Sequence, residues 1–215
     1  MKHDPRPNAP QRADSAAVHL SLSEIAALAW RATRGAGRTW GEAEESAEAA
    51  CWLARAGTDW ASALIGALAL SPDTSGCPLR AGIALADFAA LPEGVAARGA
   101  LLTDLRHPAF VLPFAARAAT ATGQALRLEW AGATATLAPL AAPMVEGAIM
   151  ATGPVDVRIA PVSLADPLLT QWPARHHGTI AADHYATLNA LMLRFTVPAS
   201  ATSQAGAGAQ GNDND

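Results

Sequence analysis

Lysine is almost absent from this chain of 215 residues: Lys2 is the only one, and arginine supplies every other basic side chain. A phosphate-binding P-loop, a Schiff-base enzyme and a protein kinase each depend on a lysine at a defined place in the fold. Lys2 lies in a polar, proline-rich segment, where none of these lysine sites would be found. We therefore expect none of these three mechanisms.

Long apolar runs and an excess of positive charge are also missing. Hydrophobic residues make up 51% of the chain. Even so, no run approaches the ~18 apolar residues that a membrane-spanning helix needs. The longest candidate, residues 60–70, contains Ser62 and Gly66 and is typical of a buried helix. The net charge of −4 argues against nucleic-acid binding, which requires a basic surface. We expect neither a membrane nor a nucleic acid as a partner.

Cysteine is scarce as well. Cys51 and Cys77 are too few for a disulfide framework, and they form no CxxC pair. Residues 1–17 are polar and lack the apolar stretch of a secretion signal. These features predict a cytoplasmic protein with reduced thiols. Cys51 is expected to be buried on a small-residue helix face, whereas Cys77, next to Pro78, is expected to be an exposed thiol.

The clearest pattern that is present is a pair of capping boxes. Ser-Leu-Ser-Glu at 21–24 and Thr-Trp-Gly-Glu at 39–42 each place a hydroxyl three residues before a glutamate, which favours the start of a helix. Gly35 ends the first predicted helix, and Gly57 ends the second. A third helix is predicted at 59–70. The second helix has one face of nearly uniform small residues, which predicts close packing against a neighbouring helix.

A different pattern follows the predicted helices. Residues 124–130 alternate leucine and tryptophan with charged side chains, which is typical of a half-buried strand. Ala131-Gly132 then predicts a hairpin turn into a second strand at 134–137. The other expected elements are a strand or single helical turn at 83–88, a helix at 108–122 that restarts at Pro113, strands at Met150 and 155–162, and a last helix at 179–194.

These elements predict the α+β class: an N-terminal three-helix unit, then a small antiparallel or mixed sheet with one or two packed helices. We expect a single domain at 18–197, divided into a helical unit at 18–71 and a sheet-containing part at 79–197. Residues 1–17 are predicted to be a disordered leader. Residues 198–215 contain mainly Gly, Ala, Asn and Asp and are predicted to be a disordered tail.

The most inviting chemistry is a histidine cluster close to the last helix. His176, His177, Asp183 and His184 would supply general acid–base groups or metal ligands. Their spacing matches no metal signature, and Asp183 also suits the first turn of a helix. A surface or capping role is the favoured interpretation, and catalysis is the alternative. We expect no bound metal.

Two further loop residues are candidates for an acid–base pair. Asp104 and His107 lie close together in sequence, and His107 precedes Pro108, which should hold it in an extended conformation. An exposed histidine at a helix entry is the favoured interpretation. The chain contains neither a dinucleotide fingerprint after a strand nor a GxSxG motif, so no cofactor is expected.

Tryptophan is frequent in the predicted helical unit. Trp52 falls on the side of its helix that carries Glu45, Glu48 and Arg55, away from the small-residue face. Such a residue would anchor a protein partner, because tryptophan is enriched at interfaces, or would pack under a later loop. Trp52 and Trp40 are therefore the candidate interface residues.

Several stretches together resemble an uncharacterised proteobacterial family, domain of unknown function 3726. The stretches that carry the resemblance are Leu20–Ile25, Arg34–Gly37, Trp40–Glu45, Val197–Ser200, Gly206–Ala209 and Asp213–Asp215. This chain departs from the family at Phe195-Thr196, where members have Thr-Tyr. The resemblance implies a bacterial, cytosolic protein and implies no activity.

Three functions are compatible with these observations. The absence of a recognisable catalytic motif favours a non-catalytic accessory or partner protein of a bacterial metabolic enzyme, with a protein partner or a homo-oligomer. The alternative is a small hydrolase, lyase or isomerase that uses His176, His177, Asp183 and His184. A small-molecule-binding sensor is the second alternative, and it requires an apolar cavity between the helical unit and the sheet.

Overall fold

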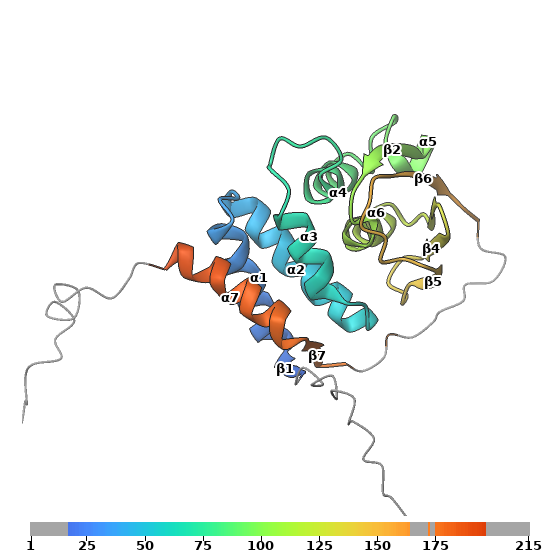
Figure 1. Ribbon diagram of the computed structural model, residues 1–215. Helices are drawn as coiled ribbons and strands as arrows, with labels where there is room; N and C mark the ends of the chain where they lie inside the picture. The colour runs from blue at the N-terminus through green and yellow to red at the C-terminus, as the bar shows by residue number, and fades with distance from the viewer. Residues whose placement is uncertain (1–16, 164–171, 173–174, 197–215) are drawn as a thin grey trace, which may run out of the picture.

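The computed structural model describes residues 17–163, 172 and 175–196 (Figure 1). Of the leader expected at 1–17, only residue 17 is described. The tail expected at 198–215 lies outside the described residues. The helices are α1 (Leu22–Gly35), α2 (Trp40–Ala56), α3 (Trp60–Leu68), α4 (Pro78–Asp87), α5 (Val95–Arg98), the 3-10 helix η1 (Pro108–Val111), α6 (Leu112–Thr122) and α7 (Ala182–Phe195). The strands are β1 (Val18–Ser21), β2 (Ala100–Leu105), β3 (Leu126–Trp130), β4 (Ala133–Leu137), β5 (Met144–Gly147), β6 (Val155–Pro161) and β7 (His177–Ile180). The predicted α+β class is confirmed.

Both capping boxes form as predicted. The Glu24 amide donates to Ser21 Oγ at 3.2 Å, and the Ser21 amide donates to the Glu24 carboxylate at 2.7 Å. Thr39 and Glu42 repeat this arrangement at the start of α2, with distances of 3.2 and 2.9 Å. At the starts of α1 and α2, these local hydrogen bonds satisfy backbone amides that have no partner within the helix.

The small-residue face of α2 is buried except for Cys51, which is half-buried, and α1 and α2 form a closely packed helix pair. The buried alanines of α2 are Ala43, Ala47, Ala49, Ala50 and Ala54. Side chains of this size let helix axes approach closely, so the predicted close packing is confirmed.

A buried arginine connects the helical unit to the next layer. Arg38 is 1% exposed and donates to the carbonyl oxygens of Leu70 at 2.7 Å and Ala67 at 3.2 Å. Its guanidinium also lies 3.7 Å from the Glu42 carboxylate and 3.8 Å from Cys77 Sγ. The expectation of an exposed Cys77 is wrong: this thiol is 3% exposed, because it lies against Arg38 where α4 begins.

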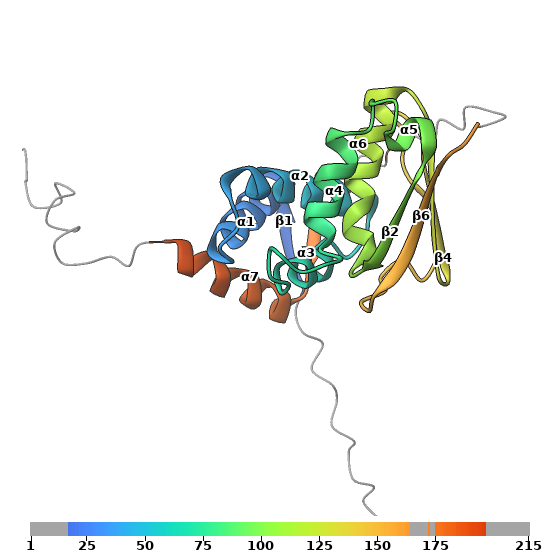
Figure 2. The same cartoon turned by 90° about the horizontal axis from the view of Figure 1, so that it is seen from above.

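The sheet has the order β2-β6-β3-β4-β5, and all its pairs are antiparallel. The predicted hairpin at Ala131-Gly132 joins β3 to β4, with Leu126 opposite Leu137. Figure 2 shows α4 and α6 on one side of this sheet. The alternation in β3 follows from this arrangement, because Leu126 and Leu128 are buried whereas Arg127 and Glu129 are exposed. The predicted sheet and its packed helices are therefore confirmed.

Several elements differ from the sequence prediction. Residues 83–88 belong largely to α4, because Pro78 starts a helix that continues to Asp87. The helix predicted to restart at Pro113 is resolved into η1 and α6, with this proline in the first turn of α6. Met150 lies in a turn and not in a strand. The sequence prediction also lacks β1, β2 and β5, of which β2 and β5 are edge strands of the sheet with weak alternation.

The end of the described chain returns to the helical unit. β7 pairs antiparallel with β1, with His177 opposite Ser21, and α7 packs against α1 and α3 (Figure 1). The sequence placed the last helix in the sheet-containing part at 79–197 and did not predict β7. Both elements lie against the N-terminal unit, because β1 offers a free strand edge and Leu188 enters the helical core.

Gly35 allows α7 to approach α1. A Cβ atom at this position would overlap the carbonyl group of Leu191, with its carbonyl carbon 2.6 Å away. The contact involves backbone on both sides, so a side chain cannot be accommodated by a rotamer change. The α1–α7 packing therefore depends on a residue without a side chain.

We predict that Gly35→Ala lowers the free energy of unfolding by about 1–3 kcal/mol, because α7 must shift away from α1. Gly41→Ala is the matched control: it is also a helical glycine, and its Cβ would meet nothing within 4 Å. This control should be neutral or slightly stabilising, since alanine has the higher helix propensity. Urea unfolding followed by circular dichroism measures both, and equal effects would contradict the proposed contact.

Candidate functional site

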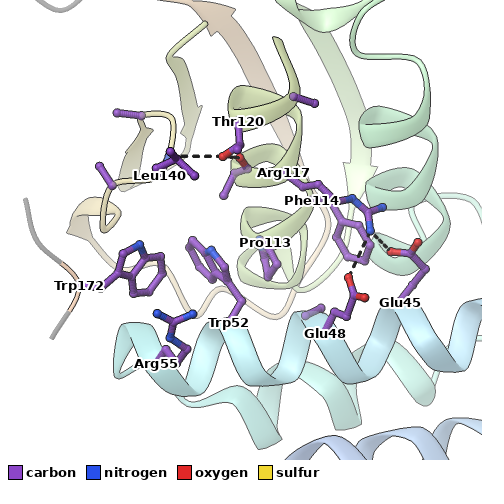
Figure 3. A pocket seen from close by; sticks show the side chains of 15 residues that line it. Glu45, Glu48, Trp52, Arg55, Pro113, Phe114, Arg117, Thr120, Leu140 and Trp172 are labelled. Atoms are coloured by element: carbon purple, nitrogen blue, oxygen red, sulfur yellow. Dashed lines mark hydrogen bonds and ion pairs between the residues drawn. The ribbon is translucent and has the colours of Figure 1, made fainter. Parts of the chain in front are cut away.

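A pocket in the described part of the chain is a groove between α2 and α6 (Figure 3). Its volume is about 550 Å³, and residues from the connection between β4 and β5, together with Trp172, complete its walls. We call this pocket the α2–α6 groove. It lies between the helical unit and the sheet-containing part, where the sensor hypothesis requires a cavity.

One face of α2 forms the floor of the groove. Glu45, Glu48, Trp52 and Arg55 follow one another at spacings of three or four residues, so they share a stripe along the helix. The sequence prediction that Trp52 lies on the side of these charged residues is therefore confirmed. The small residues of α2 pack within the helical unit, which leaves this opposite stripe to meet α6.

Trp52 and Trp172 form the aromatic end of the groove. Their ring centroids are 5.4 Å apart and the ring planes cross at 80°, an edge-to-face arrangement. The Arg55 guanidinium lies over the Trp172 ring, 4.9 Å from its centroid. Trp52 thus packs against a residue that comes much later in the sequence, in agreement with the second of its two predicted environments. Sequence reasoning missed Trp172, because no helical or strand pattern surrounds it.

A charged cluster forms the opposite end. Arg117 on α6 lies 2.5 Å from the Glu45 carboxylate and 3.6 Å from the Glu48 carboxylate. Its guanidinium also lies 5.5 Å from the centroid of the Phe114 ring. Arg117 is therefore held in place, whereas Arg55 makes no ion pair with any described residue. Arg117 was not predicted, because its partners on α2 are distant in sequence.

Leu140 lies at the rim of the groove in an unusual conformation. Its φ is +59°, in the left-handed region that residues with side chains avoid, and its side chain is 81% exposed. The backbone amide of Leu140 donates to Thr120 Oγ1 at 3.4 Å, which ties the loop to α6. A strained backbone that leaves a large apolar side chain in water is typical of a ligand-binding loop.

The predicted histidine cluster is divided between two elements. His176 and His177 are exposed at the start of β7, whereas Asp183 and His184 lie in the first turn of α7. His177 lines a second pocket of about 110 Å³ together with Arg175, and the other three residues are not among its lining. Asp183 accepts a hydrogen bond from the His184 amide at 2.8 Å, in agreement with its predicted place at a helix start. The catalytic role stays a prediction.

Neither a metal centre nor a membrane span is found in the described ranges. No group of three His, Cys, Asp or Glu side chains in these ranges is arranged to hold a metal ion. None of the helices described there combines the length and the hydrophobicity that crossing a bilayer requires.

His107 does not have the extended backbone expected before a proline. Its φ and ψ are 49° and 56°, and its ring lies on α3 where a Cβ at Gly66 would be 2.6 Å from the ring carbon Cγ. The expected extended conformation is overridden because the ring packs against this glycine. Burial lowers the pKa of His107, and the neighbouring Arg106 lowers it further. Asp104 and His107 share no hydrogen bond in the described structure, and the Asp104 amide bonds to Asp156 instead.

A second aromatic group, at the start of α2, lies outside the residues that line the groove. Trp40 is 59% exposed, and its ring centroid is 5.0 Å from that of Trp30, which lies 5.4 Å from Phe195. The Arg34 guanidinium lies over the Trp40 ring at 4.9 Å. We call these four residues the Trp40 cluster. The predicted role of Trp40 at an interface is compatible with this exposure and stays a prediction.

Residues 20–100 match the sequence model of a family described as "Protein of unknown function (DUF3726)". The match confirms the resemblance predicted from the sequence, and it covers the end of β1 and the helices from α1 to α5. The proteobacterial origin and the likeness at the C-terminal end lie outside this finding and stay predictions. No curated protein and no solved structure matches the chain.

The half-buried His107 leads to a prediction about pH. Because its folded-state pKa lies below the ordinary value of 6.5, the unfolded chain binds more protons between these two values. The free energy of unfolding should therefore fall as the pH decreases through 6.5. We predict that the melting temperature drops between about pH 7.5 and about pH 5.5, and that His107→Gln reduces this drop. Thermal melts across this pH range measure the drop in melting temperature. An unchanged pH dependence in His107→Gln would show that His107 does not cause the drop.

Proposed function

We propose that this protein is a non-catalytic small-molecule-binding protein whose ligand occupies the α2–α6 groove. The observation that carries the proposal is a cavity of about 550 Å³ walled by Trp52, Trp172, Phe114 and Pro113. Pockets of roughly 300–1,000 Å³ with apolar walls and few polar groups are typical of small-molecule sites. The strained and exposed Leu140 at the rim supports the same function.

The polar groups of the groove support binding more than catalysis. Glu45 and Glu48 both face Arg117, so neither is a free general base. The Thr120 hydroxyl donates to the Ala116 carbonyl at 3.0 Å and has no described base beside it to activate it. The alternative hydrolase, lyase or isomerase would need His176, His177, Asp183 and His184 to act on one substrate, and of these four only His177 lines the second pocket.

A second candidate function is that of an accessory or partner protein of a bacterial metabolic enzyme in the cytoplasm. The Trp40 cluster favours it, because an exposed tryptophan beside a guanidinium is a combination enriched in protein interfaces. The two functions are compatible, since a ligand sensor needs a partner to which it reports. A homo-oligomer formed through the same surface is the other form of this proposal.

The groove is tested with N-phenyl-1-naphthylamine, a neutral apolar dye that fluoresces when it leaves water. We predict saturable binding with one dye per chain. Ala116→Phe should weaken it at least tenfold, because Ala116 lines the groove and the larger ring fills it. Ala27→Phe, at an exposed position of α1, is the control and should bind as the parent protein does. Dye binding that is absent, or unchanged by Ala116→Phe, would exclude the groove as the site.

The partner role is tested on the full chain by affinity capture from the native host and by light scattering of the purified protein. We predict that Trp40→Ala abolishes a stoichiometric complex or the homo-oligomer. Phe88→Ala, which removes another exposed aromatic side chain outside the Trp40 cluster, should leave it intact. A monomer that captures no stoichiometric partner would refute this role.

A further inference from the structure

The aromatic end of the groove is built to hold a flat ring. Trp52 and Trp172 meet edge to face, so their planes are nearly perpendicular and form two sides of a corner. Figure 3 shows Trp52 projecting from α2 into the groove, with Trp172 beside it. A planar aromatic ligand in this corner would place its face against the ring of one tryptophan and its edge against the ring of the other. Both contacts are favourable.

The charges of the groove are separated along its length. Glu45, Glu48 and Arg117 together leave an excess of one negative charge at one end. Arg55 contributes a positive charge at the aromatic end and makes no ion pair with a described residue. A ligand with a single negative charge is therefore repelled by one end and attracted by the other, which gives it one orientation.

The position of Arg55 suits a carboxylate next to an aromatic ring. Its guanidinium lies over the Trp172 ring, 4.9 Å from the centroid. A guanidinium that covers an aromatic face keeps N–H donors at its edge, where they match the two oxygens of a carboxylate. The donors of Arg55 thus lie beside the surface on which the ligand ring would rest.

We infer that the ligand of the α2–α6 groove is a planar aromatic monocarboxylate, with its ring against Trp52 and Trp172 and its carboxylate paired with Arg55. This inference rests on the proposed small-molecule-binding function and names the class of ligand. Leu140 lines the same groove at its rim.

The inference is tested by calorimetry with two probes of equal shape, 2-naphthoate and its neutral amide, 2-naphthamide. The parent protein should bind 2-naphthoate about tenfold more tightly, because a charged hydrogen-bond pair exceeds a neutral one. Arg55→Gln should remove this preference while 2-naphthamide binding stays unchanged. Arg98→Gln is the matched control, since Arg98 is also an arginine in the last turn of a helix and lies outside the groove.

Each outcome separates the ligand class from the proposed function. If both probes bind the parent protein equally, or if Arg55→Gln keeps the preference, the carboxylate assignment is overturned while the groove remains a binding site. If 2-naphthoate still binds tightly to Ala116→Phe, the anion site lies elsewhere and the inference fails. If neither probe binds and the neutral dye does not bind either, the proposed function and the inference both fail. A rise in salt should weaken only 2-naphthoate, and equal salt effects on both probes would contradict the ion pair.

Discussion

The buried guanidinium of Arg38 is the interaction on which the arrangement of the layers depends. An arginine removed from water is costly unless its donors are satisfied, and here Nη2 donates to the carbonyl oxygens of Ala67 and Leu70, whereas Nε has no hydrogen-bond partner among the described residues. The Ala67 carbonyl belongs to the last turn of α3, which carries the negative end of the helix dipole. Arg38 also contacts Cys77, where α4 begins. One side chain thus joins the turn between α1 and α2 to α3 and α4, and α4 in turn supports α6.

The groove follows from the two unlike faces of α2. Its alanine face packs within the helical unit, so α2 comes close to its neighbours there and leaves little space. Its other face carries Trp52 and long charged side chains, which hold α6 at a greater distance. Arg117 bridges part of that distance by pairing with Glu45. The rest stays open, and this opening is the proposed ligand site.

Local chemistry made much of the fold predictable. The capping boxes at Ser21 and Thr39 involve residues three positions apart, and the β3–β4 hairpin needs only its own turn, so both are visible in sequence. The position of Trp52 beside the charged side chains of α2 was predictable because it too depends only on residues close in sequence. The pairing of β1 with β7 and the burial of Cys77 were not, because each depends on residues far along the chain. In the site, Trp172 and Leu140 escaped prediction on the same ground.

The sequence by itself determined where the helices of the N-terminal unit begin, which face of α2 is small, and which mechanisms lack their lysine. These properties depend on composition and on spacings within one or two helical turns. Only the tertiary structure decided that α7 returns to α1, that Arg38 is buried, and that Trp52 meets Trp172 edge to face at one end of a groove. The physical reason is that a cavity is a property of the distances between elements, and those distances are set by long-range packing that no local pattern encodes.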